Sequence, residues 1–487
     1  MRAWTSFWIA ATLLGGCSLN RTPILPDVGF DGGDAGMDVG RDAPMIDGGG
    51  EDASDDTPDG GGPDADLDAS MDDTGIDAPE DTGIDAPTDT GVDAPCETRC
   101  SDPMTLTTCV GTVETVETCE LGCYGTPAPH CASMVPANVG STWETFTPLG
   151  AVTVTTLERI NTTTCIWDRA TDLTGSVRSA DTGGDICLFV VSGLDIQTAG
   201  IVHASGNLAL IIVSTGDITI AGAIGVDSAR SATLFGGGVA GAGPRGPAAG
   251  SGGSSGIDDG GGGGGGFGGG GGAGGTGGAS GTAGPVRASG LLPLIGGSAG
   301  GAGAGPSTAA GGAGGGTMQL TAFGRLTVRG YVGASGSGGS AGVAEAVRSG
   351  AGGGGGSGGG ILLEAVTFSL EAGVINIAGG GGGASSCPND SGSVGADGID
   401  APTARAAGGP RSCGTYSADG GDGTGGASQT GEAGSNNGNG GGGGGGAGRV
   451  VFRTPNMTLD LSSAATTLNP TFASSSVLYV VSDITRR

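Results

Sequence analysis

Eleven cysteines are the residues of this sequence whose type and spacing predict chemistry most directly. Setting aside Cys17, which stands alone near the N-terminus, leaves an even number that suits disulfide formation in an oxidising compartment. The disulfide candidates are Cys96, Cys100, Cys109, Cys119, Cys123, Cys131, Cys165, Cys187, Cys387 and Cys413. We expect Cys165 to pair with Cys187 and Cys387 to pair with Cys413.

Residues 96–131 hold the first six of these cysteines and form a cysteine-rich module. Two β-rich runs, 105–110 and 113–118, flank Gly111 and predict a hairpin. A unit of this size needs covalent staples, and six cysteines allow fifteen pairings, so their connectivity stays open. The cysteine spacing also fits zinc, but we expect disulfides and no metal. The module resembles short cysteine-rich units of bacterial surface lipoproteins.

Cys17 follows an apolar run, residues 3–14, that is preceded by Arg2 and is too short to span a bilayer. The segment Leu14-Gly15-Gly16-Cys17 resembles the lipobox of bacterial lipoproteins. That resemblance implies a signal peptide over 1–16 and acyl chains on Cys17 that bind the membrane. Ser18 then favours the outer membrane, facing the cell surface or the periplasm.

Residues 17–95 form an acidic spacer that ends in the repeats DTGIDAPE, DTGIDAPT and DTGVDAPC. It holds too few large apolar residues to offset the entropy of ordering, so we expect a disordered stalk. Asp64, Asp66 and Asp68 match the start of a calcium loop, but Ala69 and Gly75 stand where such a loop needs Gly and Glu.

The charge pattern excludes several functions. The formal net charge is −30, and every basic side chain is an arginine. Without a basic patch we expect no nucleic-acid partner, and without lysine no phosphate-binding Walker loop is possible. No cofactor is indicated.

Residues 140–487 alternate strand-like runs with glycine-rich stretches. A unit of roughly 20 residues recurs, and units of that length stack in repeat proteins. The copies are 208–226, 318–334, 361–377 and 450–461, with a partial copy at 188–202. Such a unit cannot bury its own apolar face, so we predict a mainly β fold, a parallel β-solenoid (β-helix). A sandwich of antiparallel hairpins is the alternative. The second strand of the last copy would carry Met457 and Leu459.

The glycine-rich stretches near 236–316, 335–360 and 379–448 all follow the same step of the unit. Insertions at one step project from one face of a stack. Gly has the highest ordering cost of any residue, so these inserts are either packed polyglycine helices or disordered. Collagen is excluded by the lack of a strict three-residue glycine period.

The glycine composition resembles the PGRS-type surface proteins of bacteria, and the repeats resemble β-helical adhesins and glycine-rich surface lipoproteins. The resemblance spans roughly residues 190–460. It implies a surface-anchored structural or adhesive lipoprotein without catalytic activity, with the membrane and a polysaccharide or cell-surface matrix as partners. An accessory or scaffold protein of the cell envelope is an alternative.

A polysaccharide-active β-helix enzyme is the remaining alternative, and it needs converging carboxylates. The strand-borne acids are Asp195, Asp217, Glu364, Glu371 and Asp460, which share no position in the unit. G-x-S-x-G occurs at Ser298, Ser340 and Ser357 without the strand and helix that a nucleophile needs. With only His130 and His203 as bases, we expect no catalytic residue.

Overall fold

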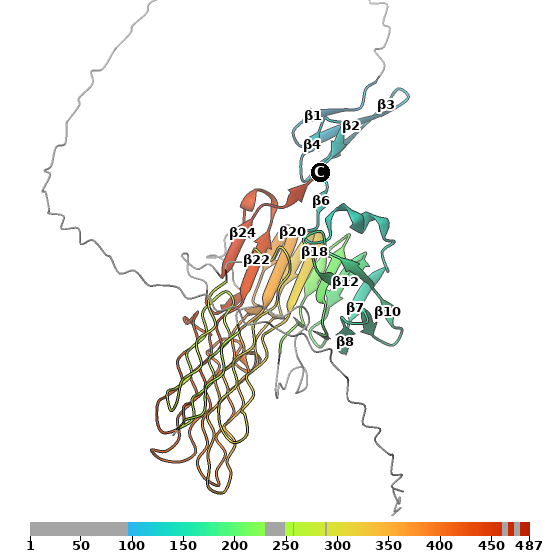
Figure 1. The fold of residues 1–487 in the computed structure, drawn as a ribbon. Helices are drawn as coiled ribbons and strands as arrows, with labels where there is room; N and C mark the ends of the chain where they lie inside the picture. The colour runs from blue at the N-terminus through green and yellow to red at the C-terminus, as the bar shows by residue number, and fades with distance from the viewer. Residues whose placement is uncertain (1–95, 229–248, 257, 288–289, 460–465, 472–477) are drawn as a thin grey trace, which may run out of the picture. The chain divides into compact units, whose positions relative to one another are not determined.

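The structure is a computed structural model, and it describes residues 96–228, 249–256, 258–287, 290–459, 466–471 and 478–487 (Figure 1). The expected signal peptide, Cys17 and the acidic spacer lie outside these residues. Thr90–Arg487 form one compact unit. Its described part is mainly β, with the short 3-10 helices η1 (Gly140–Thr145), η2 (Gly398–Asp400) and η3 (Pro455–Met457). None of the described helices has the length and apolar character needed to cross a bilayer.

The cysteine-rich module is built on the hairpin that the sequence predicts. The antiparallel sheet contains β1 (Arg99–Asp102), β2 (Thr105–Val110) and β3 (Val113–Thr118), and a second pair joins β4 (Cys123–Tyr124) to β5 (His130–Cys131). The disulfides are Cys96–Cys109, Cys100–Cys123 and Cys119–Cys131. The six thiols are therefore consumed in pairs, and none is left to bind zinc.

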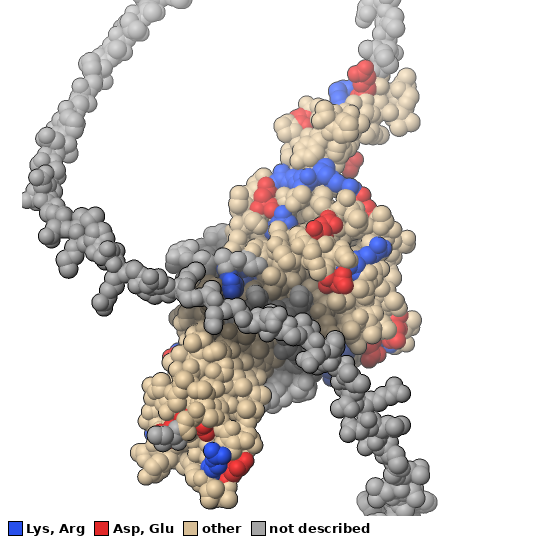
Figure 2. All heavy atoms as spheres, in the orientation of Figure 1, with Lys and Arg blue, Asp and Glu red and all other residues tan. Residues whose placement is uncertain are grey.

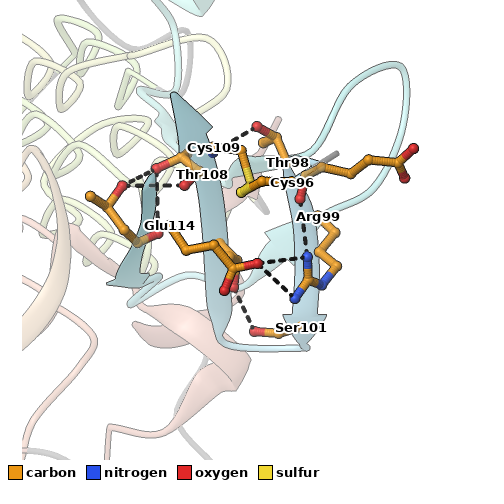
Figure 3. The surroundings of a disulfide bond; sticks show 10 residues. Cys96, Thr98, Arg99, Ser101, Thr108, Cys109 and Glu114 are labelled. Carbon is orange, nitrogen blue, oxygen red and sulfur yellow. Dashed lines mark hydrogen bonds and ion pairs between the residues drawn. A yellow bond between two sulfur atoms is a disulfide. The ribbon is translucent and has the colours of Figure 1, made fainter. Parts of the chain in front are cut away.

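Figure 3 shows how the first disulfide fixes the edge of this sheet. Cys96 and Cys109 hold the segment before β1 against β2, and the Thr98 hydroxyl accepts a hydrogen bond from the Cys109 amide at 3.2 Å. Arg99 donates to Glu114 across the sheet at 3.4 Å. Both side chains are about half exposed, so the disulfides and not this ion pair hold the module together.

Beyond the module, strands stack in parallel in three series that make up most of a ten-stranded and an eight-stranded sheet. The first series contains β12 (Asp185–Val191), β15 (Ala209–Ser214), the beginnings of β18 (Thr317–Val328) and β20 (Gly360–Leu370), β22 (Arg449–Arg453) and β24 (Tyr479–Ser482). The second contains β7 (Ala151–Val154), β13 (Gly193–Ile196), β16 (Ile218–Ile220) and the ends of β18 and β20. The third contains β8 (Leu157–Asn161), β14 (Ile201–Ser205), β17 (Ala223–Gly225), β19 (Tyr331–Gly333), β21 (Val374–Asn376) and β23 (Thr467–Asn469).

Antiparallel strands occur at the edges of the stack. They are β9 (Ile166–Asp168) and β10 (Leu173–Thr174) beside β8, β11 (Ser176–Ser179) beside β12, and β6 (Met134–Val135) with β25 (Thr485–Arg486). The pair β6–β25 ties the C-terminus to the segment that follows the cysteine-rich module. Pairing between the repeat copies is parallel throughout the described strands, so the alternative of antiparallel hairpins is wrong for them.

Equivalent side chains of successive copies lie directly over one another. Phe189 pairs with Ile212, which pairs with Leu320, then Leu363, then Phe452. All five side chains are fully buried. Burying a side chain of this size stabilises a fold by roughly 1.5–3 kcal/mol. The repeated apolar pattern of the sequence is therefore the source of both the core and the register.

The last copy differs from the prediction. Met457 belongs to η3 and not to a strand, and both Asn456 and Met457 have positive φ angles of 57° and 54°. Pro455 has no amide hydrogen for a strand ladder, which explains why the chain turns here. The prediction of a strand from the spacing of Met457 and Leu459 is therefore wrong. Conversely, the partial copy at 188–202 is complete, since β12, β13 and β14 supply every step.

The glycine inserts leave after β17, β19 and β21 and return at β18, β20 and β22. Their described residues form a bundle of extended segments, drawn as thin crossing traces in Figure 1. In the segment 351–359, every third amide donates to the same neighbour: residues 351, 354 and 357 to 298–304, residues 352, 355 and 358 to 440–446, and residues 353, 356 and 359 to 334–340. Its carbonyls accept from the segments 262–265, 312–315 and 380–383.

A repeat of three residues, with hydrogen bonds between segments, is the geometry of the polyproline-II helix and not of a strand or an α-helix. The described inserts are thus packed polyglycine helices, and the disordered alternative is wrong for them. Glycine is required because the backbones are in contact. A Cβ atom added at Gly354 would overlap the carbonyl oxygen of Gly263, and one at Gly355 that of Gly380.

Candidate functional site

The serines and histidines considered as catalytic residues lie in separate parts of the fold. Ser298 and Ser357 are buried in the glycine bundle, where the Ser298 amide donates to the Ser357 hydroxyl at 2.8 Å. Ser340 belongs to a neighbouring glycine segment. His130 is on the cysteine-rich module, with Nδ1 2.7 Å from the Ala128 oxygen. His203 is 2 % exposed on β14. The structure therefore joins none of these three serines to either histidine.

The strand-borne acids also have separate structural roles. Glu364 is fully buried, and it accepts from the Ala137 amide at 3.0 Å and from Arg453 at 2.8 Å. Burial raises the pKa of this carboxyl, against the opposing effect of Arg453. Asp217 accepts from the Arg325 amide at 2.7 Å, and Glu371 pairs with Arg329 at 2.6 Å.

Glu364 thus holds the segment around Ala137 on the sheet. Asp195 is half-buried on β13, and Asp460 lies outside the described residues. The structure gives the four described acids no common pocket, so Asp195, Asp217, Glu364 and Glu371 do not form the carboxylate convergence that an outer-groove enzyme needs.

Two further acids, both in the third insert, also have structural roles. Asp419 and Asp422 each cap a neighbouring segment: their Oδ1 atoms accept from the amides of Arg411 at 2.8 Å and Gly408 at 2.7 Å. These carboxylates are engaged with backbone donors of the bundle. The calcium-loop candidates of the spacer, Asp64, Asp66 and Asp68, lie outside the described residues.

A buried carboxylate that the sequence did not single out lies where the first insert leaves the strands. Asp227 is fully buried and accepts from the Ser335 amide at 2.6 Å, the Ser335 hydroxyl at 2.5 Å and the Tyr331 hydroxyl at 3.0 Å. Burial raises the pKa of Asp227 to about 6. Burial lowers the pKa of His203, whose Nε2 lies 3.2 Å from the Asp227 carbonyl oxygen, to about 4. These hydrogen bonds join the end of β17 to β19 and the residues after it. Because Asp227 and His203 are buried, the cluster offers no access to a substrate.

A polar cavity of about 650 Å³ opens beside β8 and β9. Its lining includes Glu158, Arg159, Asp168 and Arg169. Desolvation raises the pKa of Glu158, although Arg169 lies 3.2 Å away and lowers it. The Trp167 indole donates to the same carboxylate at 2.7 Å. Glu158 on β8 is therefore held by two donors, Trp167 on β9 and Arg169 directly after β9.

The end of the glycine bundle that is distant from the strands carries a second cavity, of about 620 Å³. We call this end the tip. The lining takes Asp258 from the first insert, Ser349 from the second, and Pro388, Cys413, Tyr416 and Asn439 from the third. All three inserts therefore contribute to one site, which they reach from different points of the strand stack.

Side chains at the tip connect these turns to one another. Asn439 is 6 % exposed; its Oδ1 accepts from the Asp259 amide at 2.7 Å and its Nδ2 donates to the Ser349 hydroxyl at 2.6 Å. The disulfide Cys387–Cys413, with Cα atoms 6.5 Å apart, joins two turns of the third insert. The tip is thus a cross-linked surface. It is carried by the hydrogen-bonded glycine segments between the strands and the tip, which we call the stem.

The outer side chains of the tip differ from those of the stem. Tyr416 is 77 % exposed and Val347 is 85 % exposed. Figure 2 shows the bundle as almost free of charge along its length on this face, with acidic and basic side chains gathered near its end. The sequence offered one signal for this site, the pair Cys387 and Cys413, which the structure joins as it joins Cys165 to Cys187.

Comparison of the chain with family models, with curated proteins and with solved structures finds no match to any of them.

Proposed function

We propose that the protein is a lipid-anchored surface protein with a structural or adhesive role, in which the tip of the glycine bundle is the binding end. The observation that carries the proposal is the tip cavity, to which Asp258, Ser349 and Tyr416 come from three different inserts. Binding residues concentrate on loops that a rigid scaffold positions. A stem of packed polyglycine helices is such a scaffold, because each segment is hydrogen-bonded to its neighbours.

The proposal includes the finer description of the fold, a β-solenoid with its inserts on one face. The parallel register of successive copies supports it. It also includes acylation of Cys17 and location in the outer membrane, for which the lipobox-like segment is the support. The acidic spacer would then hold the solenoid away from the membrane.

Attachment of whole cells to beads coated with cellulose, chitin or agarose tests the adhesive role. Cells carrying Tyr416→Ala are expected to attach less than wild type. Cells carrying Tyr124→Ala, which alters a 39 % exposed tyrosine of the cysteine-rich module, are expected to attach normally. Equal attachment of wild type and Tyr416→Ala would remove the tip as the binding end.

The location is tested with Cys17→Ala. We expect the wild-type protein in the outer-membrane fraction and cleaved by protease added to intact cells, and the variant released from the membrane. Protection of the membrane-bound wild type from external protease would place it on the periplasmic side and favour an envelope-scaffold role over adhesion.

A polysaccharide-active enzyme remains a second candidate because of the cavity at Glu158. The enzyme candidate rests on Glu158, whose carboxyl group has a raised pKa and lines an open polar cavity together with a second acid, Asp168. Release of reducing ends from soluble polysaccharides by the wild type, abolished in Glu158→Gln, would support this candidate. Absence of release by the wild type would remove it.

A further inference from the structure

We propose that the tip cavity is a saccharide-binding site in which Tyr416 provides the surface for ring stacking. This inference rests on the proposed function, because it names the ligand class of the same site. Within the described glycine inserts the other aromatic side chain is Phe267, which is 1 % exposed and packs in the cluster with Leu291 and Leu294. Tyr416 is the aromatic group that the described part of the inserts presents to solvent.

The surroundings of Tyr416 combine apolar and polar groups. Pro388 and the disulfide of Cys413 give the cavity apolar walls, while Asp258 and Thr415 bring a carboxylate and a hydroxyl to its lining. A sugar ring has an apolar C–H face and an edge of hydroxyl groups. The face suits an aromatic ring, and the edge suits carboxylate and hydroxyl partners.

Charge argues for a neutral ligand. Asp258 is the charged side chain of the described lining, and no arginine belongs to it. An anionic ligand would therefore meet a carboxylate without a compensating cation. A quaternary ammonium ligand prefers a cage of several aromatic rings, whereas the described lining offers one. A neutral saccharide meets neither difficulty.

The cavity is also held in shape before a ligand binds. The side chain of Asn439 accepts a hydrogen bond from the Asp259 amide and donates one to the Ser349 hydroxyl. The Ser417 hydroxyl donates to the Cys413 carbonyl at 3.0 Å and accepts from the Cys413 amide at 3.2 Å. The turn that carries Tyr416 is thus closed on itself and bound to Cys387 by the disulfide. Preorganisation of this kind lowers the entropic cost of binding.

The test is calorimetric titration of the full-length protein in detergent with glucose, galactose, mannose, N-acetylglucosamine, cellobiose and lactose, each to about 10 mM. We expect saturable binding of at least one of them. Loss of the stacking contact in Tyr416→Ala is expected to weaken that affinity by about tenfold, and Tyr416→Phe is expected to preserve it. Val347→Ala, on a neighbouring turn outside the cavity lining, is the matched control and is expected to bind as wild type.

The outcomes separate this inference from the proposed function. If Tyr416→Ala reduces attachment to the polysaccharide-coated beads while none of the sugars binds, the tip remains the binding end, and the inference that the cavity binds a saccharide ring is overturned in favour of contact with an extended polysaccharide surface. Sugar binding that Tyr416→Ala leaves unchanged also overturns it. If the variant loses sugar binding but attaches normally, the saccharide site stands and the adhesive role fails.

Discussion

Asn439 and Ser349 join two separate glycine inserts at the tip, since the side-chain amide of Asn439 donates to the Ser349 hydroxyl at 2.6 Å. The same asparagine accepts from the Asp259 amide of the first insert at 2.7 Å. One buried side chain therefore connects all three inserts, next to the cavity that we propose as the binding site.

Asn439→Ala is expected to loosen the tip. The substitution removes the partners of the Asp259 amide and the Ser349 hydroxyl, which are part-buried, so we expect a cost of about 1 kcal/mol, the lower end of the range for a buried polar group without a partner. Hydrogen exchange should accelerate at Asp259 and its neighbours while the strands remain protected. Asn436→Ala is the control, because Asn436 is exposed and accepts from a single amide, that of Thr276. Equal exchange in both variants would contradict the linking role.

A second prediction concerns the glycine stem. In Gly354→Ala the new Cβ would overlap the Gly263 carbonyl oxygen, and this backbone atom cannot move without breaking the lattice of hydrogen bonds. Overpacking of this kind costs about 1–3 kcal/mol, measured as a lower free energy of unfolding in denaturant. Gly252→Ala is the matched control, because its Cβ would lie 3.4 Å from the Ala302 oxygen, an ordinary contact. A stem of flexible segments would tolerate both substitutions equally.

Much of the strand region could be predicted from the sequence because its determinants are local. Period-two alternation and a repeated apolar step identified the copies that stack Ile212 on Leu320 and Leu363. The same kind of pattern misled at Met457, where Pro455 and the positive φ of Asn456 end the strand. The alternation of apolar and polar residues carries no information on backbone hydrogen-bond donors or dihedral angles, and these determine whether a strand forms at such a position.

The tip could not be derived from the sequence. Its cavity depends on which glycine segments are neighbours, and runs of glycine carry almost no register information. The order follows from side chains spaced far apart, such as Asn439 with Ser349, which are separated by 90 positions. Burial of Asp227 was hidden for the same reason, since its partner Tyr331 lies in the next copy of the repeat and its partner Ser335 directly after that copy.

Asp227 gives a third prediction, about pH. Because the pKa of Asp227 is about 6 in the folded protein and 3.8 in its reference state, the folded state holds a proton that the unfolded state has lost between these values. The free energy of unfolding contributed by Asp227 therefore falls as pH rises from about 4 through about 6. Asp227→Asn removes this dependence and keeps an oxygen that can accept from Ser335 and Tyr331.

The stability of Asp227→Asn relative to wild type should accordingly rise by about 3 kcal/mol between pH 4 and pH 7, a shift of about two pKa units. His203 has the opposite trend, since its pKa of about 4 lies below 6.5, and its contribution is lost as pH falls. That contribution is present in both proteins and cancels in the difference. Denaturant titrations at several pH values measure the difference in free energy of unfolding between Asp227→Asn and wild type. A difference that does not change with pH would contradict the assignment of Asp227 as a buried acid with a raised pKa.

The last prediction separates the two disulfides outside the cysteine-rich module. Cys387–Cys413 and Cys165–Cys187 close loops with separations of 26 and 22 residues, so loop entropy alone gives each about 3–4 kcal/mol of stabilisation. The double variants Cys387→Ser/Cys413→Ser and Cys165→Ser/Cys187→Ser should thus lose similar free energies of unfolding.

Their effects on ligand binding should differ. The first variant frees the turn that carries Tyr416 from the turn at Pro388, whereas the second alters β12 and the turn before β9, far along the chain from the tip. Cell attachment and sugar affinity are expected to fall in the first variant and to stay at wild-type levels in the second, measured under conditions where both are folded. Equal losses in the two variants would mean that binding follows global stability, and the tip would lose its special role.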